Sequence, residues 1–290
     1  MNIVAVTDGM GQGPKYYMKE PSIITPPRKS GLMLRIVSAL VMLPIAIFII
    51  LQGGIIYSLF VALLTVLILY EWNGICEGKA FNAAFILQSL LSLMLIYAFY
   101  QGQYFTPYAY LAGAGLLVVS CLYYKIKLHF ALAGLAYALL PAASLLWLRQ
   151  YSDQGGWIVL WVMIIVWSMD TGAYFAGKNI GGPKMAPRIS PNKTWAGLIG
   201  GTVVAVITGL IAAFYFNFEY DWMALAAAAA LLAIWSQIGD LAESAVKRHF
   251  NVKDSGAIIP GHGGIMDRVD GVVFAAPAAA LSLYFLSSGA

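Results

Sequence analysis

Long apolar segments, separated by short polar ones, set the pattern of this chain. A helix that crosses a bilayer needs roughly 20 mainly apolar residues. Segments of this kind predict nine membrane-spanning helices, at about 34–51, 54–70, 82–100, 104–123, 128–147, 157–176, 197–218, 222–239 and 271–288. The predicted fold is therefore an all-α polytopic integral membrane protein with about nine transmembrane helices.

The composition supports this class and limits the domain organisation. Hydrophobic residues make up 61% of the chain and charged residues 10%, which is typical of polytopic membrane proteins rather than soluble ones. The longest polar segments reach only roughly 20–30 residues, too short for a separate core. We expect a flexible tail over 1–30, N-terminal transmembrane helices over 31–150, and a second transmembrane region over 151–290 with long polar loops at 177–196 and 240–270.

The basic residues predict the orientation in the membrane. Short loops that are rich in Lys and Arg stay in the cytoplasm. With nine spans and a cytoplasmic N-terminus, every lysine and arginine except Arg149 falls on the cytoplasmic side. The loops 177–196 and 240–270 then lie on the same face, where they can form one site.

Charged residues are concentrated within 244–270, in a chain where they are otherwise sparse. Ionisable groups at the edge of a bilayer are costly and are usually kept for chemistry or transport. If the helix at 222–239 continues past its apolar part, four polar residues share one of its faces: Asp240, Ser244, Lys247 and Arg248. An acid, a hydroxyl and two cations suit a bound metal–phosphate complex. The alternative is charge pairing that ends the helix at the membrane interface.

A glycine-rich segment leads into two further carboxylates. Gly261, Gly263 and Gly264 free the backbone to approach a ligand and present N–H groups to phosphate oxygens. Asp267 and Asp270 follow, one helical turn apart. Such oxygen ligands suit Mg²⁺, which takes one or two carboxylates and shares the rest of its shell with water and phosphates. The alternative is that the glycines only form turns.

Asp170 and the loop after it form a third candidate. Asp170 lies inside an apolar run, and an isolated acid on a membrane helix is a functional candidate by default; a packing hydrogen bond is the alternative. Ser190, Lys193 and Thr194 follow in a loop that prolines hold extended. Lys193 at the start of the next predicted helix is suited to contact a phosphate, unless the cations of this loop only determine orientation.

The remaining ionisable and reactive side chains carry little signal. Glu71 and Glu77 are interpreted as solvated loop charges. Cys76 and Cys121 match neither a disulfide framework nor a metal cluster. The many Trp and Tyr residues fit interfacial belts better than a base-stacking surface, so no nucleic-acid partner is expected.

The residues from Ser244 to Asp270 resemble the signature of the phosphatidate cytidylyltransferases, also called CDP-diacylglycerol synthases. The matching pattern is S-x-x-K-R-x4-K-D-x-G-x2-I-P-x-H-G-G-I-x-D-R-V-D. Shorter blocks that are similar to the same family lie at 170–174, 190–195 and 239–244, and the resemblance covers 157–290. One position departs from it, because Ala196 stands where many members carry an acidic or amide residue.

The resemblance implies a homodimeric membrane enzyme. The expected location is the bacterial inner membrane, with the N-terminus and active site in the cytoplasm as the basic residues predict. The implied reaction converts CTP and phosphatidate into CDP-diacylglycerol and pyrophosphate with Mg²⁺, and K⁺ is associated with the site. Asp240 and Asp267 are the implied metal ligands, and the expected catalytic residues are Asp240, Lys247, Asp267 and Asp270. The expected substrate-binding residues are Asp170, Ser190, Lys193, Thr194, Ser244, Arg248, Lys253, Asp254, His262, Gly263, Gly264 and Arg268.

Elementary phosphate chemistry agrees with this reaction. A phosphate monoester has a second pKa near ~6, so it is largely a dianion at neutral pH and needs neither a strong general base nor a covalent enzyme nucleophile. It needs charge neutralisation, because two polyanions must approach each other. In this interpretation Mg²⁺ acts together with four cations, Lys193, Lys247, Arg248 and Arg268. His262 either donates to the pyrophosphate or only shapes the backbone, and Asp270 either holds a second cation or orients Arg268.

Two alternative functions stay open. The first is a related membrane enzyme that uses CTP on an isoprenoid ether lipid or phosphorylates a polyprenol. The second is a transporter with Asp170 as its ion site. Transporters place polar residues near the midplane of paired broken helices, whereas the polar residues here gather in two loops at one face.

Overall fold

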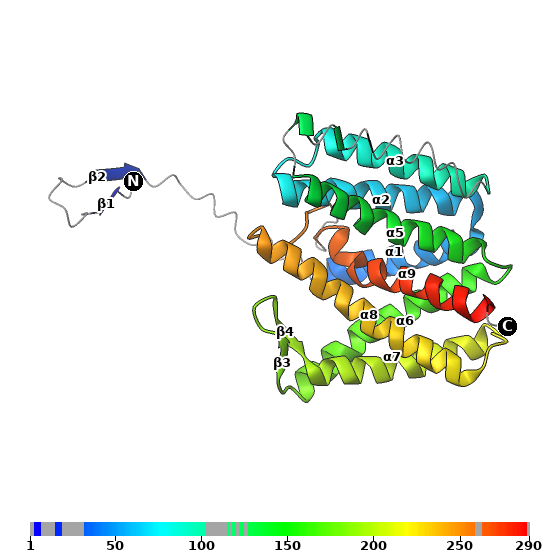
Figure 1. Ribbon diagram of the computed structural model, residues 1–290. Helices are drawn as coiled ribbons and strands as arrows, with labels where there is room; N and C mark the ends of the chain where they lie inside the picture. Colours follow the sequence, from blue (N-terminus) through cyan, green and yellow to red (C-terminus); the bar gives the residue numbers. More distant parts are fainter. Residues whose placement is uncertain are drawn as a thin grey trace.

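Helices form nearly all of the described structure (Figure 1). The computed structural model describes residues 3–6, 15–18, 32–102, 115, 118–119, 122–124, 127–258 and 263–288. The long helices are α1 (Leu32–Gln52), α2 (Gly54–Glu77), α3 (Ala83–Tyr100), α5 (Leu128–Gln150), α6 (Gly155–Asn179), α7 (Trp195–Tyr215), α8 (Trp222–His249) and α9 (Met266–Ser288). They pack side by side into one bundle, in which α2, α3 and α5 lie on one flank and α6, α7 and α8 on the other (Figure 1).

Seven helices, α2, α3 and α5 to α9, are long and apolar enough to cross a membrane, counting only the described residues. The predicted fold class, an all-α membrane protein, is therefore confirmed. Eight of the nine predicted spans coincide with helices of the structure. The predicted span at 104–123 lies mostly outside the described residues, so the number nine stays a prediction.

Side-chain caps mark where several helices begin. Asn82, Thr194 and Asp221 each accept a hydrogen bond from the backbone N–H three residues further on. Such caps satisfy N–H groups that have no partner within the first helical turn. The caps therefore fix the starts of α3, α7 and α8.

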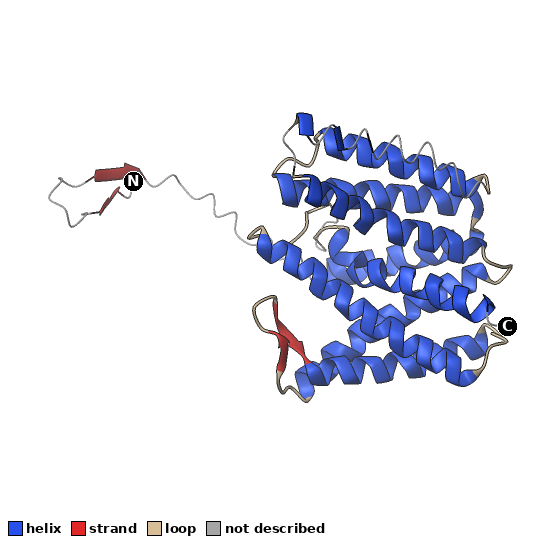
Figure 2. Ribbon diagram, in the orientation of Figure 1, coloured by secondary structure: helices blue, strands red, loops and turns tan. Residues whose placement is uncertain are grey.

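Two short antiparallel strand pairs complete the structure, as Figure 2 shows. β1 (Ile3–Val6) pairs with β2 (Lys15–Met18), and β3 (Lys184–Ala186) pairs with β4 (Ser190–Thr194). The second pair is a hairpin within the loop 177–196, where the sequence predicts only an extended segment. Strands this short carry no clear alternation of apolar and polar residues, so the pattern cannot reveal them.

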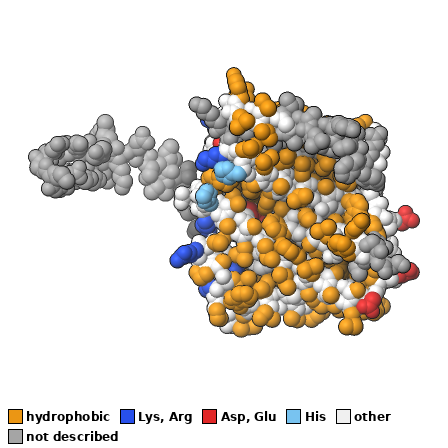
Figure 3. All heavy atoms as spheres, in the orientation of Figure 1, with side chains coloured by type: hydrophobic (Ala, Val, Ile, Leu, Met, Phe, Trp, Pro, Cys, Tyr) orange, Lys and Arg blue, Asp and Glu red, His pale blue; other side chains and the backbone are white. Residues whose placement is uncertain are grey.

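The surface of the bundle matches a protein embedded in a bilayer. Figure 3 shows hydrophobic side chains over the visible flank and Lys and Arg gathered at the end where β3 and β4 lie. Large apolar side chains such as Ile199, Phe214 and Met223 are exposed along the helices. Together with the seven apolar helices, this distribution identifies an integral membrane protein.

Small residues allow α6 and α7 to pack closely near the β3–β4 hairpin. A Cβ atom on Gly172 would lie 3.0 Å from the Cα atom of Gly201. A Cβ atom on Gly201 would lie 2.7 Å from both the carbonyl oxygen and the sulfur of Met169. Glycine at such positions lets helix backbones approach closely in membranes. This contact holds the end of α6, with Asp170, against the start of α7.

We expect Gly201→Val to destabilise the protein by about 1–3 kcal/mol, because the added side chain overpacks the α6–α7 contact. The measurement is thermal unfolding of the purified protein in detergent. Ile199→Val is the matched control, since Ile199 is 63% exposed on the same helix. Equal unfolding temperatures for the two variants would contradict the close contact.

Candidate active site

Asp240 on α8 and Lys193 on β4 form an ion pair at the end of the bundle where the hairpin lies. Lys193 Nζ is 2.5 Å from Asp240 Oδ2, and the two side chains are 13% and 30% exposed. Ser244 Oγ donates to Asp240 Oδ1 across 3.3 Å. α8 continues to His249, so the predicted shared face of Asp240 and Ser244 is confirmed. The two polar loops meet here, as the sequence predicts.

Lys247 lies between two carboxylates and connects α8 to α9. Its Nζ is 2.6 Å from Asp267 Oδ1 and 3.1 Å from Glu243 Oε1. Lys247 and Asp267 are each 12% exposed, and Glu243 is fully buried. Within a low-dielectric interior such pairs interact strongly, and removal of one partner leaves an uncompensated buried charge. The lysine therefore balances two acids from different parts of the chain.

Asp267 also fastens the segment that precedes α9. Its Oδ2 accepts hydrogen bonds from Ser255 N at 3.1 Å, Ser255 Oγ at 3.0 Å and Gly264 N at 3.0 Å. Gly263 has a φ of +85°, a backbone conformation that favours glycine. Both oxygens of Asp267 thus have fixed partners on α8 and in the preceding loop.

Asp170 and Asp270 lie near the Asp240–Lys193 pair. The charges of Asp240 and Lys193 act on Asp170, and those of Asp240, Asp170 and Lys193 act on Asp270. Asp270 Oδ1 accepts a hydrogen bond from Gly271 N at 2.8 Å. The side chain of Asp170 is exposed and forms no hydrogen bond within the described residues, so its functional role stays a prediction.

Tyr137 on α5 and Glu243 on α8 belong to the same group, although no role is predicted for either from the sequence. Electrostatic interactions place Tyr137 near Glu243, Asp270, Asp240 and Asp267. The Tyr137 hydroxyl and Glu243 Oε2 are buried without a partner among the described residues, whereas Glu243 Oε1 pairs with Lys247. Unpaired buried polar atoms of this kind are uncommon and call for a ligand, ion or water.

Three of the expected substrate-binding residues have structural contacts near the hairpin. Thr194 is buried, and its Oγ1 accepts the N–H of Gly197 as the cap of α7. Arg248 is exposed and donates to the carbonyl oxygens of Ile189 at 3.4 Å and Val252 at 3.2 Å. Ser190 begins β4. The hairpin and the end of α8 are therefore tied together beside the site.

The other expected substrate-binding residues differ in how exposed they are. Lys253 and Asp254 are exposed in the loop after α8, and Arg268 is exposed in the first turn of α9. Gly264 is buried against Ser255 and Glu71 rather than open to a ligand. Gly261 and His262 lie outside the described residues.

The interpretation of Glu71 and Glu77 as solvated loop charges is wrong. α2 continues seven residues beyond its predicted end at 70, so both residues are helical; Glu71 is buried and Glu77 is partly buried. Glu71 is 3% exposed and accepts hydrogen bonds from three donors in the 255–266 segment. Glu77 has a buried oxygen without a partner among the described residues. The apolar window ends at 70 because the residues that follow are more polar, so it does not reveal the continuation of α2.

The donor set of the site suits a hard divalent cation. The described residues contain no cluster of three or more His, Cys, Asp or Glu side chains arranged around a common point. Carboxylates from α6, α8 and α9 nevertheless interact electrostatically with one another, and Glu243 Oε2 has no partner within the described residues. Mg²⁺ commonly takes one or two carboxylates and fills its shell with water and substrate phosphate, so the residues fit that ion.

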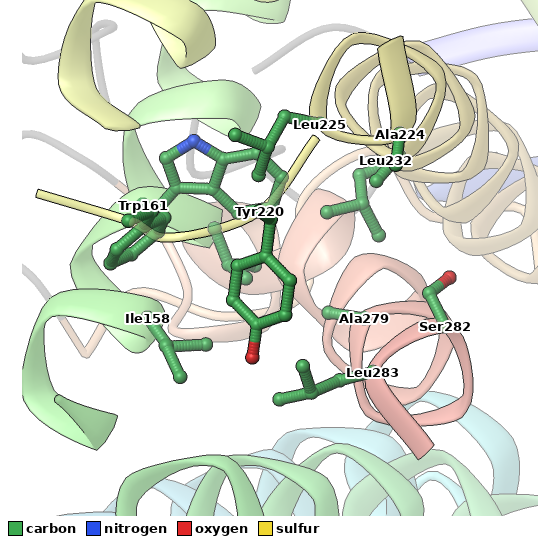
Figure 4. A pocket seen from close by; sticks show the side chains of 12 residues that line it. Ile158, Trp161, Tyr220, Ala224, Leu225, Leu232, Ala279, Ser282 and Leu283 are labelled. Carbon is green, nitrogen blue, oxygen red and sulfur yellow. The ribbon is translucent and has the colours of Figure 1, made fainter. Parts of the chain in front are cut away.

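Two cavities lie at the opposite end of the bundle and lack such a group of charges. The first, between α6, α8 and α9, is apolar, with a volume of about 50 Å³ (Figure 4). Ligand pockets usually measure roughly 300–1,000 Å³, so it is too small for a nucleotide. The second, about 550 Å³, is lined in part by Tyr57 and Arg149, and Arg149 donates to the carbonyl oxygens of Ile50 and Leu51. The acid–lysine group at the hairpin end remains the candidate active site.

The sequence profile of the cytidylyltransferase family matches residues 33–286. This chain belongs to the cytidylyltransferase family. It is 41% identical over 249 residues to the phosphatidate cytidylyltransferase of Brucella suis biovar 1, a match that covers 85% of this chain and 91% of that protein. The phosphatidate cytidylyltransferase of Staphylococcus haemolyticus is 32% identical over 248 residues, covering 84% and 95%. That of Bacillus subtilis is 42% identical over 139 residues, covering 48% and 50%.

The family assignment confirms the resemblance drawn from the sequence and identifies the chain as a nucleotidyltransferase. The match begins in α1, so it includes the N-terminal helices as well as the charged segments. Members of the cytidylyltransferase family transfer a cytidylyl group, which requires a site for phosphates. The lysines and carboxylates at the hairpin end are the residues of this chain that suit that requirement.

We expect Lys247→Met to destabilise the protein by about 3–5 kcal/mol, because it leaves Glu243 and Asp267 without their shared cation. Thermal unfolding in detergent measures the effect. Lys184→Met, on the exposed side of the hairpin, is the matched control. An additional Glu243→Gln change should recover part of the loss, and an unchanged unfolding temperature in Lys247→Met would refute the pairing.

Proposed function

We propose that this chain is a CTP:phosphatidate cytidylyltransferase, which forms CDP-diacylglycerol and pyrophosphate for phospholipid biosynthesis. The supporting observation is a group of lysines and carboxylates at one end of a membrane bundle, in a chain that is 41% identical to a protein named phosphatidate cytidylyltransferase. A site at the end of the bundle suits a substrate whose tails stay in the bilayer while its headgroup meets a soluble nucleotide.

In the proposed reaction, a phosphate oxygen of phosphatidate attacks the α-phosphorus of CTP, and pyrophosphate leaves. The lipid phosphate is already mostly a dianion at neutral pH, so this site needs no activated side-chain nucleophile. The requirement is to bring two polyanions together. Lys193 and Lys247 fill that role, because both ammonium groups are held in place and are only slightly exposed before substrate binds.

Asp240 and Asp267 are the proposed ligands of Mg²⁺, with K⁺ as a further candidate ion near Asp270. When bound, Mg²⁺ supplies charge neutralisation to the phosphates. Asp240 and Asp267 each pair with a lysine in this structure. The same carboxylates therefore orient the lysines, and the lysines offset the negative charge of the site.

The proposed location is the bacterial inner membrane, with the hairpin end in the cytoplasm. Lys and Arg gather at this end on the visible face, which is the distribution expected from the positive-inside rule (Figure 3). CTP then enters from the cytoplasm, and a homodimer is the expected assembly. A transporter is disfavoured, because Asp170 interacts with the acid–lysine group at the end of the bundle.

We expect the purified chain, with CTP labelled in its α-phosphate, to transfer the label to phosphatidate and to release pyrophosphate. The assay separates the alternatives by product. Release of CDP with a phosphorylated lipid would indicate a polyprenol kinase. Transfer only to an ether lipid would indicate the related enzyme, and the absence of any labelled lipid would overturn the proposal.

We expect Asp240→Asn and Asp267→Asn each to lower the rate of CDP-lipid formation at least about 100-fold, since each removes charge from the centre of the site. Asp153→Asn, at the opposite end of the bundle, is the control and should keep wild-type activity. Unfolding in detergent confirms that the variants are folded. Near-normal Mg²⁺-dependent activity in either site variant would remove that residue from the proposed metal site.

A further inference from the structure

Glu71 is a buried carboxylate on α2 that holds the segment before α9 from the other flank of the bundle. Its Oε1 accepts the N–H of Ile265 at 2.9 Å, and its Oε2 accepts the N–H of Met266 at 2.8 Å. Its Oε2 also accepts the hydroxyl of Ser255 at 2.9 Å. Glu71 is separated from Ile265 and Met266 by 194 and 195 residues along the chain. One side chain thus binds two parts of the segment 244–270, which is called the charged segment below: Ser255 and the residues 265–266.

These hydrogen bonds place a negative charge at the N-terminus of α9. The first N–H groups of a helix have no partner within the helix, and the helix dipole favours an anion there. Met266 is the first residue of α9, and Ile265 precedes it. Glu71 therefore acts as a cap that comes from another helix, and it fixes where α9 begins. Asp267 is the second residue of that helix.

Ser255 connects Glu71 with Asp267. Its hydroxyl lies 2.9 Å from Glu71 Oε2 and 3.0 Å from Asp267 Oδ2, and its N–H donates to Asp267 at 3.1 Å. The hydroxyl carries a single hydrogen, so the two carboxylates share it. Glu71 is therefore linked to Asp267 in two ways, through Ser255 and through the start of α9.

Two glycines of the charged segment are required by the position of Glu71. A Cβ atom on Gly256 would lie 2.6 Å from Glu71 Oε1. A Cβ atom on Gly264 would lie 2.6 Å from Glu71 Oε2 and would also collide with Ser255 Oγ. The backbone at these positions therefore closes around the carboxylate. The segment is shaped to receive Glu71.

We propose that Glu71 is a positioning residue for catalysis: through Ser255 and the first turn of α9 it sets the place and orientation of the Asp267 carboxylate. The proposal rests on the proposed function in naming Asp267 as a ligand of the metal. Groups that orient a metal ligand from behind typically change metal affinity or activity by about 10–100-fold when they are altered. Glu71 does not touch the reacting atoms.

The test is Glu71→Gln, which keeps the shape of the side chain but turns an NH₂ donor toward the N–H of Met266 or Ile265. We expect kcat to fall about 10–100-fold and the Mg²⁺ concentration for half-maximal activity to rise, with KM for CTP nearly unchanged. Asn73→Ala is the matched control, because Asn73 is buried on the same helix and bonds Gln88 instead of the charged segment. The control should lose stability without a change in Mg²⁺ dependence.

Amide hydrogen exchange without metal or substrate gives a second readout. Glu71→Gln should raise exchange at 264–267, and Asn73→Ala should not. If Glu71→Gln fails to fold, Glu71→Asp, which keeps the charge on a shorter side chain, takes its place. Ser255→Ala should give a smaller shift in Mg²⁺ dependence in the same direction, and the double variant should show less than the sum of the two shifts, because Ser255 carries one of the two links between Glu71 and Asp267.

The two proposals fail in different ways. A wild-type chain that makes no CDP-lipid contradicts the proposed function, whereas the exchange experiment still tests the position of the segment. Wild-type exchange at 264–267 together with wild-type Mg²⁺ dependence in Glu71→Gln would overturn the positioning role. Equal effects of Glu71→Gln and Asn73→Ala on both readouts would reduce Glu71 to a purely structural residue.

Discussion

The site depends on the compensation of closely spaced negative charge. Carboxylates from α6, α8 and α9 interact at one end of a membrane bundle, and the one that is fully buried, Glu243, would be costly without a cation. Lys193 and Lys247 each join segments that are distant in the chain, β4 to α8 and α8 to α9. The same pairs hold the cations that a reaction between two phosphates requires. The same ion pairs therefore stabilise the fold and position the cations for the proposed reaction.

The small-residue contact between α6 and α7 makes this arrangement possible. Gly172 and Gly201 allow the two backbones to approach, so that α6 can carry Asp170 and α7 can begin directly after β4. Thr194 caps α7, and the preceding residue, Lys193, is thereby directed to Asp240 on α8. The close packing of α6 against α7 at these glycines therefore helps to determine where the charged side chains meet at the end of the bundle.

Much of this could be predicted from the sequence, and the remainder has a physical explanation. Apolar segments long enough to span a bilayer predict the helices, and charge density with a helical spacing predicts that Asp240 and Ser244 share a face. Glu71 and Tyr137 could not be predicted, because their partners lie in other helices and no local pattern encodes that contact. The β3–β4 hairpin was missed because its strands are too short for a readable alternation.

The contacts of Glu71 change how the recognisable segment should be understood. From the sequence alone, its glycines suit a backbone that approaches phosphate. In the structure Gly256 and Gly264 instead make room for a carboxylate on α2, and Ser255 lies between that carboxylate and Asp267. The segment is therefore not self-sufficient, because the helix that orients its central acid lies in the other half of the chain. A fragment that keeps only the charged loops and the C-terminal helices would retain Asp240, Lys247 and Asp267 but lose the group that holds Asp267 from behind.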